Sequence, residues 1–556
     1  MKEQLLKALR EAVAPLGIDA SLVKLDYPED SSNGDFSTNI AMVSAKALKI
    51  APKALAEKII AEFEKVKPGF IEKVGIAGPG FINFTIKDEA IAEAALALAN
   101  MKKPAATGRK VMVEYTDPNP FKEFHIGHLM SNAIGESISR LVESSGAKVI
   151  RANWQGDVGP HVAKAIWGAM HSKDTGKGAA FWSKAYVAGA IAYEDDPGAK
   201  KEIEEINKKI YSKSDKEING LYEKGRAESL EAFESIYKKL DTKFDNYFFE
   251  GTEGRNGESI VKDHLKEGVF EESEGAVVFK GEKYGLHTRV FITSHGLPTY
   301  ETKELGLNTE KFRLYSELSE SVIITANEQS EYFKVLLKVM SLIMPDIAAK
   351  TKHISHGLMR FASGKMSSRK GNVVSAESLI DEIRGMVKEK MAGRELNAAK
   401  IDEISDQVAI GAIKYTILRQ AIGGDVVFDS AKSISFEGDS GPYLQYSAVR
   451  ANSVLEKAGK QDAPGTKKLP DKVGLLEKLI IRFPDVVERA RDEYAPQLVA
   501  NYLTGVAAAF NAFYAGNIIV DDKEPLSPYR IALTRSFLKV MTDGLWLLGI
   551  KVPNKM

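Results

Sequence analysis

"VMVEYTDPNPFKEFHIGHLMSNAIGESISRLVESSGAKVIRANWQGDVG", residues 111–159, is the stretch of sequence that decides the fold. It opens with the strand-like run VMVEYT, passes through a turn with two prolines, and continues as a helical pattern before a second strand-like run, KVIRANWQ. Strand–helix–strand order with short connections is typical of a parallel sheet. The sequence therefore predicts an α/β fold built around a parallel sheet.

The pattern of hydrophobic residues differs before and after this stretch. Residues 1–103 alternate helical patterns with the strand candidate GFINFTI, which predicts a small α+β domain that ends in a polar linker. Residues 104–375 carry the parallel-sheet pattern, interrupted by a Lys-, Glu- and Ala-rich helical insertion near 171–280. Residues 376–556 are helical throughout, which predicts an all-α bundle. At roughly 150 residues per domain, the 556 residues have room for three domains.

Composition narrows the class of protein. The chain is 44% hydrophobic and 27% charged, as soluble globular proteins are, and 76 Lys and Arg balance 76 Asp and Glu. This balance argues against a histone-like coat on nucleic acid, but it allows a local basic groove. The absence of cysteine excludes disulfides and cysteine-bound zinc. We expect a cytoplasmic, monomeric enzyme with no structural metal and no membrane span.

Two histidines, His125 and His128, flank Gly127 at the point where the first strand gives way to the helix. A helix start favours phosphate because it has unpaired N–H groups and the positive end of the dipole. Both imidazoles can donate hydrogen bonds to phosphate oxygens, and Gly127 lets a flat base approach the backbone. For this motif alone, two polar residues that merely cap a helix are the alternative.

A second motif lies in GLMRFASGKMSSRKGNVVS, residues 357–375, which predicts a glycine-bearing loop. Residues 352–376 carry five Lys or Arg and no acid. Lys365, Ser367 and Ser368 can wrap a polyphosphate by charge and hydroxyl donation. A solvated basic loop or a generic nucleic-acid contact is the alternative. HIGH followed by KMSS on a parallel-sheet pattern is more specific than either motif alone.

The two motifs resemble those of class I aminoacyl-tRNA synthetases, and nearly the whole chain resembles arginyl-tRNA synthetase. NGDFSTNIAM and AGPGFINF are similar to the family's N-terminal tRNA-binding domain, and SFEGDSGPYLQYSAVR is similar to the start of its helical anticodon-binding domain. The resemblance implies a class I Rossmann-like catalytic domain between an N-terminal α+β domain and a C-terminal helical bundle.

The resemblance also implies a reaction, arginine–tRNA ligation. L-Arginine attacks the α-phosphorus of ATP, accompanied by Mg²⁺, and the 3′-terminal adenosine of tRNA(Arg) then takes the arginyl group. In the family, arginine activation waits for tRNA. The catalytic residues implied are His125, His128 and Lys365. The ATP-binding residues implied are Gly127, His356, Gly357, Met359, Lys365, Met366, Ser367 and Ser368.

Recognition of the amino acid needs acceptors, because a guanidinium has five donors in one plane. By resemblance, Glu114 and Asn119 hold the α-amino and carboxylate end of arginine. Tyr300 lies against the guanidinium, and Gln329 hydrogen-bonds near it. Glu304 stands where the family usually has an aspartate, so the charge is kept and the pocket is slightly reshaped. Without the family context, Tyr300 and Glu304 are equally a helix-surface pair at i,i+4.

Aromatic side chains are the candidates for tRNA contacts. Phe81 and Asn83 lie on the N-terminal strand, where the family grips the outer corner of tRNA; a buried Phe81 is the alternative. In the bundle, Tyr443, Tyr446 and Tyr514 are candidates for stacking on anticodon bases. Most tyrosines at helical spacing belong to a core, so we expect only one or two of these to contact RNA.

Other functions stay open on the sequence alone. A second class I synthetase, such as the class I lysyl type, fits Glu304, although the AGPGFINF block favours the arginyl type. A tRNA-binding regulatory protein derived from a synthetase would show damaged HIGH or KMSS residues, and both motifs are intact. A free-standing nucleotidyltransferase shares HxGH but needs no helical C-terminal region of this length.

Overall fold

The computed structural model describes residues 1–556 with the exception of 29, 175, 363–373, 394–396 and 460–467. The described chain forms two compact units, and each is described here by itself. The first unit comprises Met1–Met101, Arg450–Pro484 and Ala508–Val540. The second unit comprises Lys102–Val449, Asp485–Ala507 and Met541–Met556. The domain boundaries at 103 and 375 stay a prediction.

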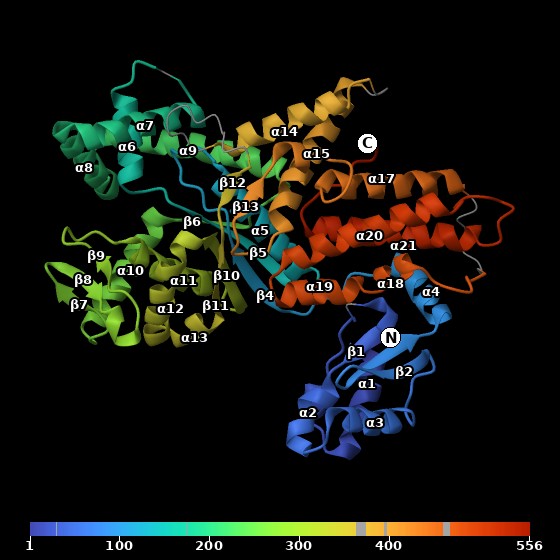
Figure 1. Cartoon of the computed structure of the whole chain (residues 1–556). Helices are drawn as coiled ribbons and strands as arrows, with labels where there is room; N and C mark the ends of the chain where they lie inside the picture. Colours follow the sequence, from blue (N-terminus) through green and yellow to red (C-terminus); the bar gives the residue numbers. More distant parts are fainter. Residues whose placement is uncertain (29, 175, 363–373, 394–396, 460–467) are drawn as a thin grey trace. The chain divides into compact units, whose positions relative to one another are not determined.

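A five-stranded sheet organises the second unit (Figure 1), and its strand order is β11-β10-β4-β5-β6. Every neighbouring pair in it is parallel. The order reverses between β4 and β10, and doubly wound sheets bind ligands outside the carboxyl ends of the strands at such a point. The strands are β4 (Lys110–Glu114), β5 (Lys148–Gln155), β6 (Asn246–Phe249), β10 (Leu318–Ala326) and β11 (Thr351–His356).

The central strand and the helix that follows it form as the sequence predicts. Val111, Met112 and Val113 of β4 are fully buried, as expected for a parallel strand covered on both faces. Helix α5 (Ile126–Glu143) starts at His125 and buries most of its residues. The run KVIRANWQ forms β5, and the expected parallel α/β architecture is confirmed.

The catalytic region also contains the helices α6 to α13 (Figure 1). They are α6 (Pro160–Met170), α7 (Ala179–Asp195), α8 (Pro197–Ser212), α9 (Lys216–Lys239), α10 (Glu250–Leu265), α11 (Tyr300–Leu314), α12 (Ser330–Ile343) and α13 (Pro345–Lys350). Helices α6 to α9 share one buried apolar cluster, which includes Val162, Trp182 and Tyr222. Helices α11 and α12 pack with α10 around a second cluster.

The insertion predicted near 171–280 is helical only as far as Lys239 and again in α10. Strand β6 lies inside the range and forms an edge of the main sheet. The strands β7 (Glu271–Ser273), β8 (Ala276–Phe279) and β9 (Arg289–Ile292) form a separate antiparallel sheet. The difference arises because β6 is only four residues long, between two charged helices, and is too short to show a period of its own.

Within its described residues, the C-terminal part is helical with one exception. Its helices are α14 (Ala376–Lys390), α15 (Ala398–Leu418), α16 (Ser430–Ser433), α17 (Gly441–Ala458), α18 (Leu475–Ile480), α19 (Phe483–Asp492), α20 (Pro496–Gly516) and α21 (Ser527–Leu547). The exception is β13 (Val426–Phe428), which pairs in parallel with β12 (Met359–Phe361). This short strand differs from the expectation of helix throughout.

One helix in the described ranges, α20, is long and apolar enough to cross a membrane. We expected no such stretch from the sequence. Its Val499, Leu503 and Val506 are fully buried in the protein. Core helices of helical bundles pass the same test of length and composition, so the feature is weak evidence for a span.

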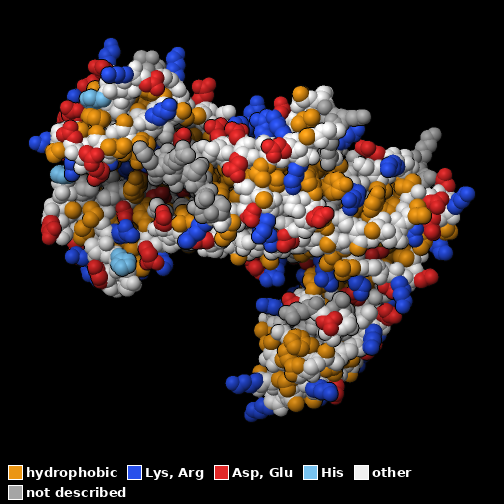
Figure 2. Space-filling view, turned by 45° about the horizontal axis from the view of Figure 1, so that its top comes forward, with side chains coloured by type: hydrophobic (Ala, Val, Ile, Leu, Met, Phe, Trp, Pro, Cys, Tyr) orange, Lys and Arg blue, Asp and Glu red, His pale blue; other side chains and the backbone are white. Residues whose placement is uncertain are grey.

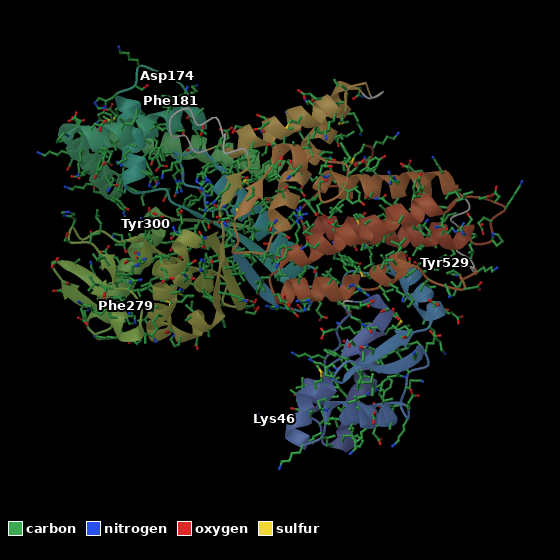
Figure 3. The ribbon with its side chains drawn as sticks, viewed as in Figure 1. Lys46, Asp174, Phe181, Phe279, Tyr300 and Tyr529 are labelled. Carbon is green, nitrogen blue, oxygen red and sulfur yellow. The ribbon has the colours of Figure 1, made fainter. Side chains whose placement is uncertain are left out.

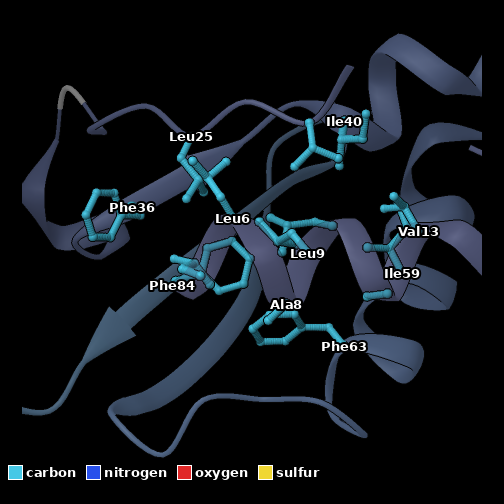
Figure 4. Close-up of a cluster of buried hydrophobic side chains, with 14 of the residues drawn as sticks. Leu6, Ala8, Leu9, Val13, Leu25, Phe36, Ile40, Ile59, Phe63 and Phe84 are labelled. Atoms are coloured by element: carbon cyan, nitrogen blue, oxygen red, sulfur yellow. The ribbon is translucent and has the colours of Figure 1, made fainter. Parts of the chain in front are cut away.

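The first unit contains the antiparallel sheet β1-β3-β2, covered by helices. Its core is drawn in Figure 4, where Leu9, Ile59 and Phe63 meet Phe84 of β3. The strands are β1 (Phe36–Thr38), β2 (Ile71–Ala77) and β3 (Phe81–Ile86), and the helices are α1 (Lys2–Val13), α2 (Ile40–Leu48), α3 (Pro52–Phe63) and α4 (Asp88–Ala97). This is the α+β region expected from GFINFTI.

Candidate active site

The two motif histidines form one stacked pair at the start of α5. Their ring centroids lie 3.7 Å apart with an interplanar angle of 20°. Nδ1 of His125 accepts a hydrogen bond from the Gly127 N–H at 3.1 Å, and Nδ1 of His128 accepts one from the His125 N–H at 3.2 Å. Because each Nδ1 accepts, each Nε2 must carry the proton in the neutral ring. The pair therefore offers two N–H donors at a helix start.

Both imidazoles are held in the neutral state. Burial and Lys122 lower the pKa of His125. Burial, then His125 and Lys122, hold the pKa of His128 well below its usual value of 6.5. At neutral pH the histidines thus act as hydrogen-bond donors without a charge of their own. The nearby positive charge comes from Lys122 and from the helix dipole.

Gly127 has a steric reason to be a glycine beyond the approach of a base. A Cβ at this position would lie 2.9 Å from Cε1 and 3.0 Å from Nδ1 of His125. Such contacts would push the imidazole out of its hydrogen bond with the Gly127 N–H. The glycine therefore preserves the histidine pair itself.

The second motif approaches the histidines from a distant part of the chain. The Ile126 N–H donates to the Val374 carbonyl at 3.1 Å, and the Ala376 N–H donates to the Phe124 carbonyl at 2.8 Å. Ser375 forms an antiparallel bridge with His125. Lys365, Met366, Ser367 and Ser368 lie outside the described residues. The segment that follows them is nevertheless attached directly to the HIGH motif.

The other predicted ATP residues lie before the undescribed segment 363–373. His356 ends β11 and is buried, with Nδ1 2.8 Å from the Gly357 carbonyl oxygen. A Cβ on Gly357 would overlap the backbone of Gly424, so this glycine is required by packing. Met359 is buried in β12.

A buried cluster of charges lies at the carboxyl end of β4. Glu114, the last residue of β4, forms an ion pair with Lys311 of α11 at 2.7 Å, and both are almost completely inaccessible. Glu304, also on α11, is 5% exposed. Asp117 follows in the turn, is half-buried, and accepts the Trp154 N–H at 2.8 Å. We call Glu114, Asp117, Glu304 and Lys311 the pocket cluster.

The pocket cluster has an excess of negative charge, with three carboxyl groups to one ammonium. Burial and, after it, the nearby Glu114 raise the pKa of Glu304 to about 8. Burial, followed by Glu114, holds the pKa of Asp117 well above its usual range. No group of three or more His, Cys, Asp or Glu in the described ranges is arranged to hold a metal ion. The excess of carboxyl groups gives the cluster a chemistry that suits a cation.

The rim around this cluster carries the other predicted arginine residues. Tyr300, labelled in Figure 3, begins α11 and is 61% exposed. Asn119 lies against Gly156, where a Cβ would overlap its Oδ1. Gln329 is exposed at the carboxyl end of β10. In Figure 2 the surface is hollowed between the insertion helices and α10–α13, and acidic side chains are visible in the hollow.

An ion pair that sequence reasoning missed holds this rim in place. Lys303 donates to Glu250, the first residue of α10, at 2.6 Å, and both are buried. The Lys303 ammonium also lies 5.1 Å from the centre of the Tyr300 ring. Helices α10 and α11 approach closely because a Cβ on Gly306 would overlap the Glu253 carbonyl. The pair thus fixes the position of the aromatic ring.

The turn between β4 and α5 is strained, which the sequence did not reveal. Thr116, Asp117 and Phe121 have φ of 81°, 46° and 68°, in the left-handed region that costs non-glycine residues energy. Phe121 is held by its N–H, which donates to Ser229 at 2.9 Å. Two prolines marked a turn, but they gave no sign of these dihedrals. Strained backbone of this kind concentrates at functional sites.

Lys311 and Asp117 belong to the pocket cluster but were not predicted as site residues, because the sequence pattern around each is only weakly informative. Lys311 is seven residues after Glu304, two helical turns along the same face of α11. Asp117 was read as a turn residue. The pairing of α11 with β4 joins segments far apart in sequence, and no local pattern reports such a contact.

The tRNA candidates differ in exposure. Phe81 is 38% exposed on β3, and Asn83 lies on the same face, so the alternative of a buried Phe81 is wrong. Tyr514 is exposed, and the Arg450 guanidinium lies 5.2 Å from its ring centre. Tyr443 and Tyr446 are half-buried, and Tyr446 packs edge-on against Phe436.

The parallel sheet with a pair of neutral imidazoles at its switch point matches the catalytic domain of class I aminoacyl-tRNA synthetases. Three family models match the chain: "tRNA synthetases class I (R), catalytic domain" over residues 91–430, "Arginyl tRNA synthetase N terminal domain" over 1–86, and "DALR anticodon binding domain" over 444–556. The chain belongs to the arginyl-tRNA synthetase family.

Known proteins agree with this placement. The arginine–tRNA ligase of Pediococcus pentosaceus is 30% identical, and that of Streptococcus agalactiae is 31% identical, each over 100% of both chains. The arginyl-tRNA synthetase of Thermus thermophilus has the same fold, with a TM-score of 0.84 at 24% identity over 100% of both chains. The Plasmodium falciparum enzyme has a TM-score of 0.79 at 20% identity, over 100% of this chain and 98% of that one.

Proposed function

We propose how this chain carries out the reaction of its family, in which it acts as an ATP-dependent arginine–tRNA ligase. A carboxylate oxygen of L-arginine attacks the α-phosphorus of ATP, and the bond to the bridging oxygen of the β-phosphate breaks. Arginyl-adenylate and pyrophosphate result. A hydroxyl of the 3′-terminal adenosine of tRNA(Arg) then attacks the arginyl carbonyl, AMP leaves, and the hydroxyl proton passes to solvent.

The observation that carries this assignment is the pocket cluster, an excess of buried carboxyl groups at the same sheet edge as the histidine pair. A fixed planar cation is the ligand that such a site requires. We assign the guanidinium to Glu304, with Tyr300 against its face and Gln329 hydrogen-bonding near it. Glu114, which is paired with Lys311, and Asn119 hold the α-amino and carboxylate end of arginine.

The phosphates belong to the histidine pair. The Nε2–H groups of His125 and His128 donate to phosphate oxygens as charge builds in the transition state. Mg²⁺ accompanies ATP and neutralises part of its charge. Lys365, with Ser367 and Ser368, neutralises the departing pyrophosphate, and Gly127 admits the adenine. His356, Gly357, Met359 and Met366 complete the ATP site.

The remaining assignments concern tRNA and the cell. Phe81 and Asn83 contact the outer corner of tRNA(Arg), which their shared exposed face supports. Of Tyr443, Tyr446 and Tyr514, the last has the most exposed ring for stacking on an anticodon base. We propose a monomeric enzyme in the cytoplasm with domains at residues 1–103, 104–375 and 376–556.

Charging of total tRNA with each of the twenty amino acids, one at a time, tests the function. We expect charging with arginine alone. Charging with lysine instead would establish the class I lysyl type, and charging with none would favour a tRNA-binding regulatory protein.

Two variants test the catalytic roles. His128→Ala and Lys365→Ala should each slow adenylate formation by about 10²–10³-fold while the fold survives, because each removes a donor to the phosphates. The matched control is Glu205→Gln, a change on the exposed face of α8. Pyrophosphate exchange with and without tRNA shows whether activation waits for tRNA. Normal exchange in both variants would refute the assigned roles.

A further inference from the structure

We propose that binding of arginine to the pocket cluster releases about one proton, and that Asp117 sets the pH at which this happens. This inference rests on the proposed function, because it takes the guanidinium as the ligand. Beyond the proposed function, it explains how the carboxyl groups are neutralised when no arginine is bound, and it gives Asp117, a residue of the turn after β4, a role in arginine binding.

The geometry brings more carboxyl groups together than the protein neutralises. Glu304, Asn308 and Lys311 are spaced at i, i+4 and i+7, so they share one face of α11. That face meets the end of β4, where Lys311 pairs with Glu114 at 2.7 Å. Asp117 is fixed beside them by the Trp154 N–H at 2.8 Å. One ammonium thus faces three carboxyl groups.

A second observation points to a missing donor. Asn308 is fully buried and uses its Nδ2 to donate to Glu304, at 2.9 Å to the carbonyl and 3.4 Å to Oε2. Its Oδ1 has no hydrogen-bond partner among the described residues. A buried acceptor left unpaired costs about 1–3 kcal/mol, and a guanidinium brings five donors. Substrate would therefore meet an acceptor that the empty protein leaves unsatisfied.

Among the described residues, charged and titratable groups approach Glu304 from several elements. Glu114 lies across from it on β4, Lys311 is on its own helix, and Glu250 is at the start of α10. Tyr332 of α12 is buried, and its hydroxyl donates to the Tyr300 carbonyl at 3.3 Å. Since Glu250 is paired with Lys303 at 2.6 Å, it adds little net charge. Lys311 balances Glu114 in the same way, at 2.7 Å, so the excess belongs to Asp117 and Glu304.

A proton and a guanidinium are alternatives for neutralising this excess. Ionising all three carboxyl groups in a buried site would be costly, so the empty pocket retains protons on the acids that lack a cation. The guanidinium keeps its positive charge at any physiological pH, so its arrival favours the ionised form and expels a proton. Because protons compete with arginine, affinity must rise with pH and level off once the empty pocket is deprotonated.

Calorimetric titration of the full-length enzyme with L-arginine tests this, using buffers of different ionisation heat. At pH 7 we expect release of about one proton, with Kd falling by up to about tenfold per pH unit from 6.5 to 8 and levelling off above. L-Citrulline, the neutral isostere of arginine, is the matched probe. It should bind without proton release and with a Kd that does not change over the same range.

Variants locate the proton. Asp117→Asn removes one excess charge, so it should lower the pH at which the Kd for arginine levels off by about one unit. Glu304→Gln combined with Asp117→Asn should abolish proton release, and Glu205→Gln should leave it unchanged. The KM for arginine in tRNA charging, measured over the same pH range, provides a second readout. This KM can be measured even if arginine binds only weakly in the absence of tRNA, because the charging assay contains tRNA.

The outcomes separate this inference from the function. Arginine binding or charging with a pH-independent constant and no proton release would overturn the proton exchange and leave the ligase function intact. Failure to charge arginine at any pH would overturn the function itself. If the variants fail to fold, the contrast between arginine and citrulline on the unmodified enzyme still decides.

Discussion

Two buried sets of charges in the second unit differ in charge balance. In the first set, which we call closed, each carboxylate is paired with cations of the set, whereas in the second the carboxyl groups outnumber the cations. The closed set, which we call the scaffold cluster, joins Glu136 and Arg140 of α5 to Arg151 of β5. Glu136 accepts from Arg140 at 2.7 Å, from Arg151 at 3.0 Å and from the Tyr115 hydroxyl at 2.5 Å. The pocket cluster instead has two carboxyl groups more than it has cations.

The outer members of the scaffold cluster complete its balance. Arg151 reaches Glu143 at 3.0 Å, and Arg140 reaches Asp241 at 3.1 Å. Lys414, fully buried, donates to the Leu240 carbonyl at 2.6 Å and to the Gly549 carbonyl at 2.9 Å. Burial, then Arg140, lower its pKa to about 7, so it can shed its charge.

The difference teaches how to distinguish support from substrate recognition among buried charges. Burial penalises every ion, so a set that serves only the fold must satisfy itself. A set that remains unbalanced is stable only with protons or a ligand in place. By this criterion the scaffold cluster stabilises the position of α5 and of the histidines at its start. The pocket cluster has the unbalanced charge expected of a site that binds a cation.

The largest expected effect is on recognition by the pocket cluster. Glu304→Gln should lower kcat/KM for arginine by about 10²–10³-fold, because a buried ion pair that loses one partner costs about 3–5 kcal/mol. The unfolding temperature should not fall, since the empty pocket already has surplus acid. Charging kinetics and thermal unfolding measure the two. Glu304→Asp, which keeps the carboxylate, is the matched control and should retain activity within about tenfold; equal loss in both variants would contradict a role of charge.

The opposite pattern is expected in the scaffold cluster. Glu136→Gln leaves Arg140 and Arg151 without the carboxylate they share, and should lower the free energy of unfolding by about 3 kcal/mol. The KM for arginine should stay unchanged, because Glu136 touches no substrate group. Denaturant unfolding and charging assays of the same preparation check this. A variant with altered KM and normal stability would break the distinction between the clusters.

The distinction also explains what the sequence could predict. β4, β5 and α5 were predicted because a buried parallel strand is a continuous apolar run and α5 has a clear helical period. Glu114 and Glu304 were placed by resemblance to a family. Neither their shared cluster nor its charge excess was visible, because both depend on Lys311 and Asp117 meeting them across the fold. Local patterns report periods, whereas charge balance is a property of distant contacts.

A smaller effect should appear in the pH dependence of stability. The pKa of Lys414 is about 7 in the folded protein and near 10.5 when unfolded, so between these values the unfolded chain binds the extra proton. Its contribution to stability must therefore rise with pH across this window, by about 1 kcal/mol per pH unit. The stability difference between the unmodified enzyme and Lys414→Met, measured at pH 7 and pH 9, should shift by that slope in favour of the unmodified enzyme. A constant difference would show that Lys414 stays charged.

The smallest effect is expected at the rim, which belongs to neither cluster. Tyr300 is 61% exposed, and its ring is positioned by Lys303 rather than by burial. An exposed aromatic face contributes about 0.5–1 kcal/mol to holding a cation, so Tyr300→Leu should raise the KM for arginine by about two- to fivefold. Tyr300→Phe keeps the face and should change KM by less than about twofold. A loss in the leucine variant as large as that from Glu304→Gln would mean that stacking, and not the unbalanced carboxylates, dominates recognition of the guanidinium.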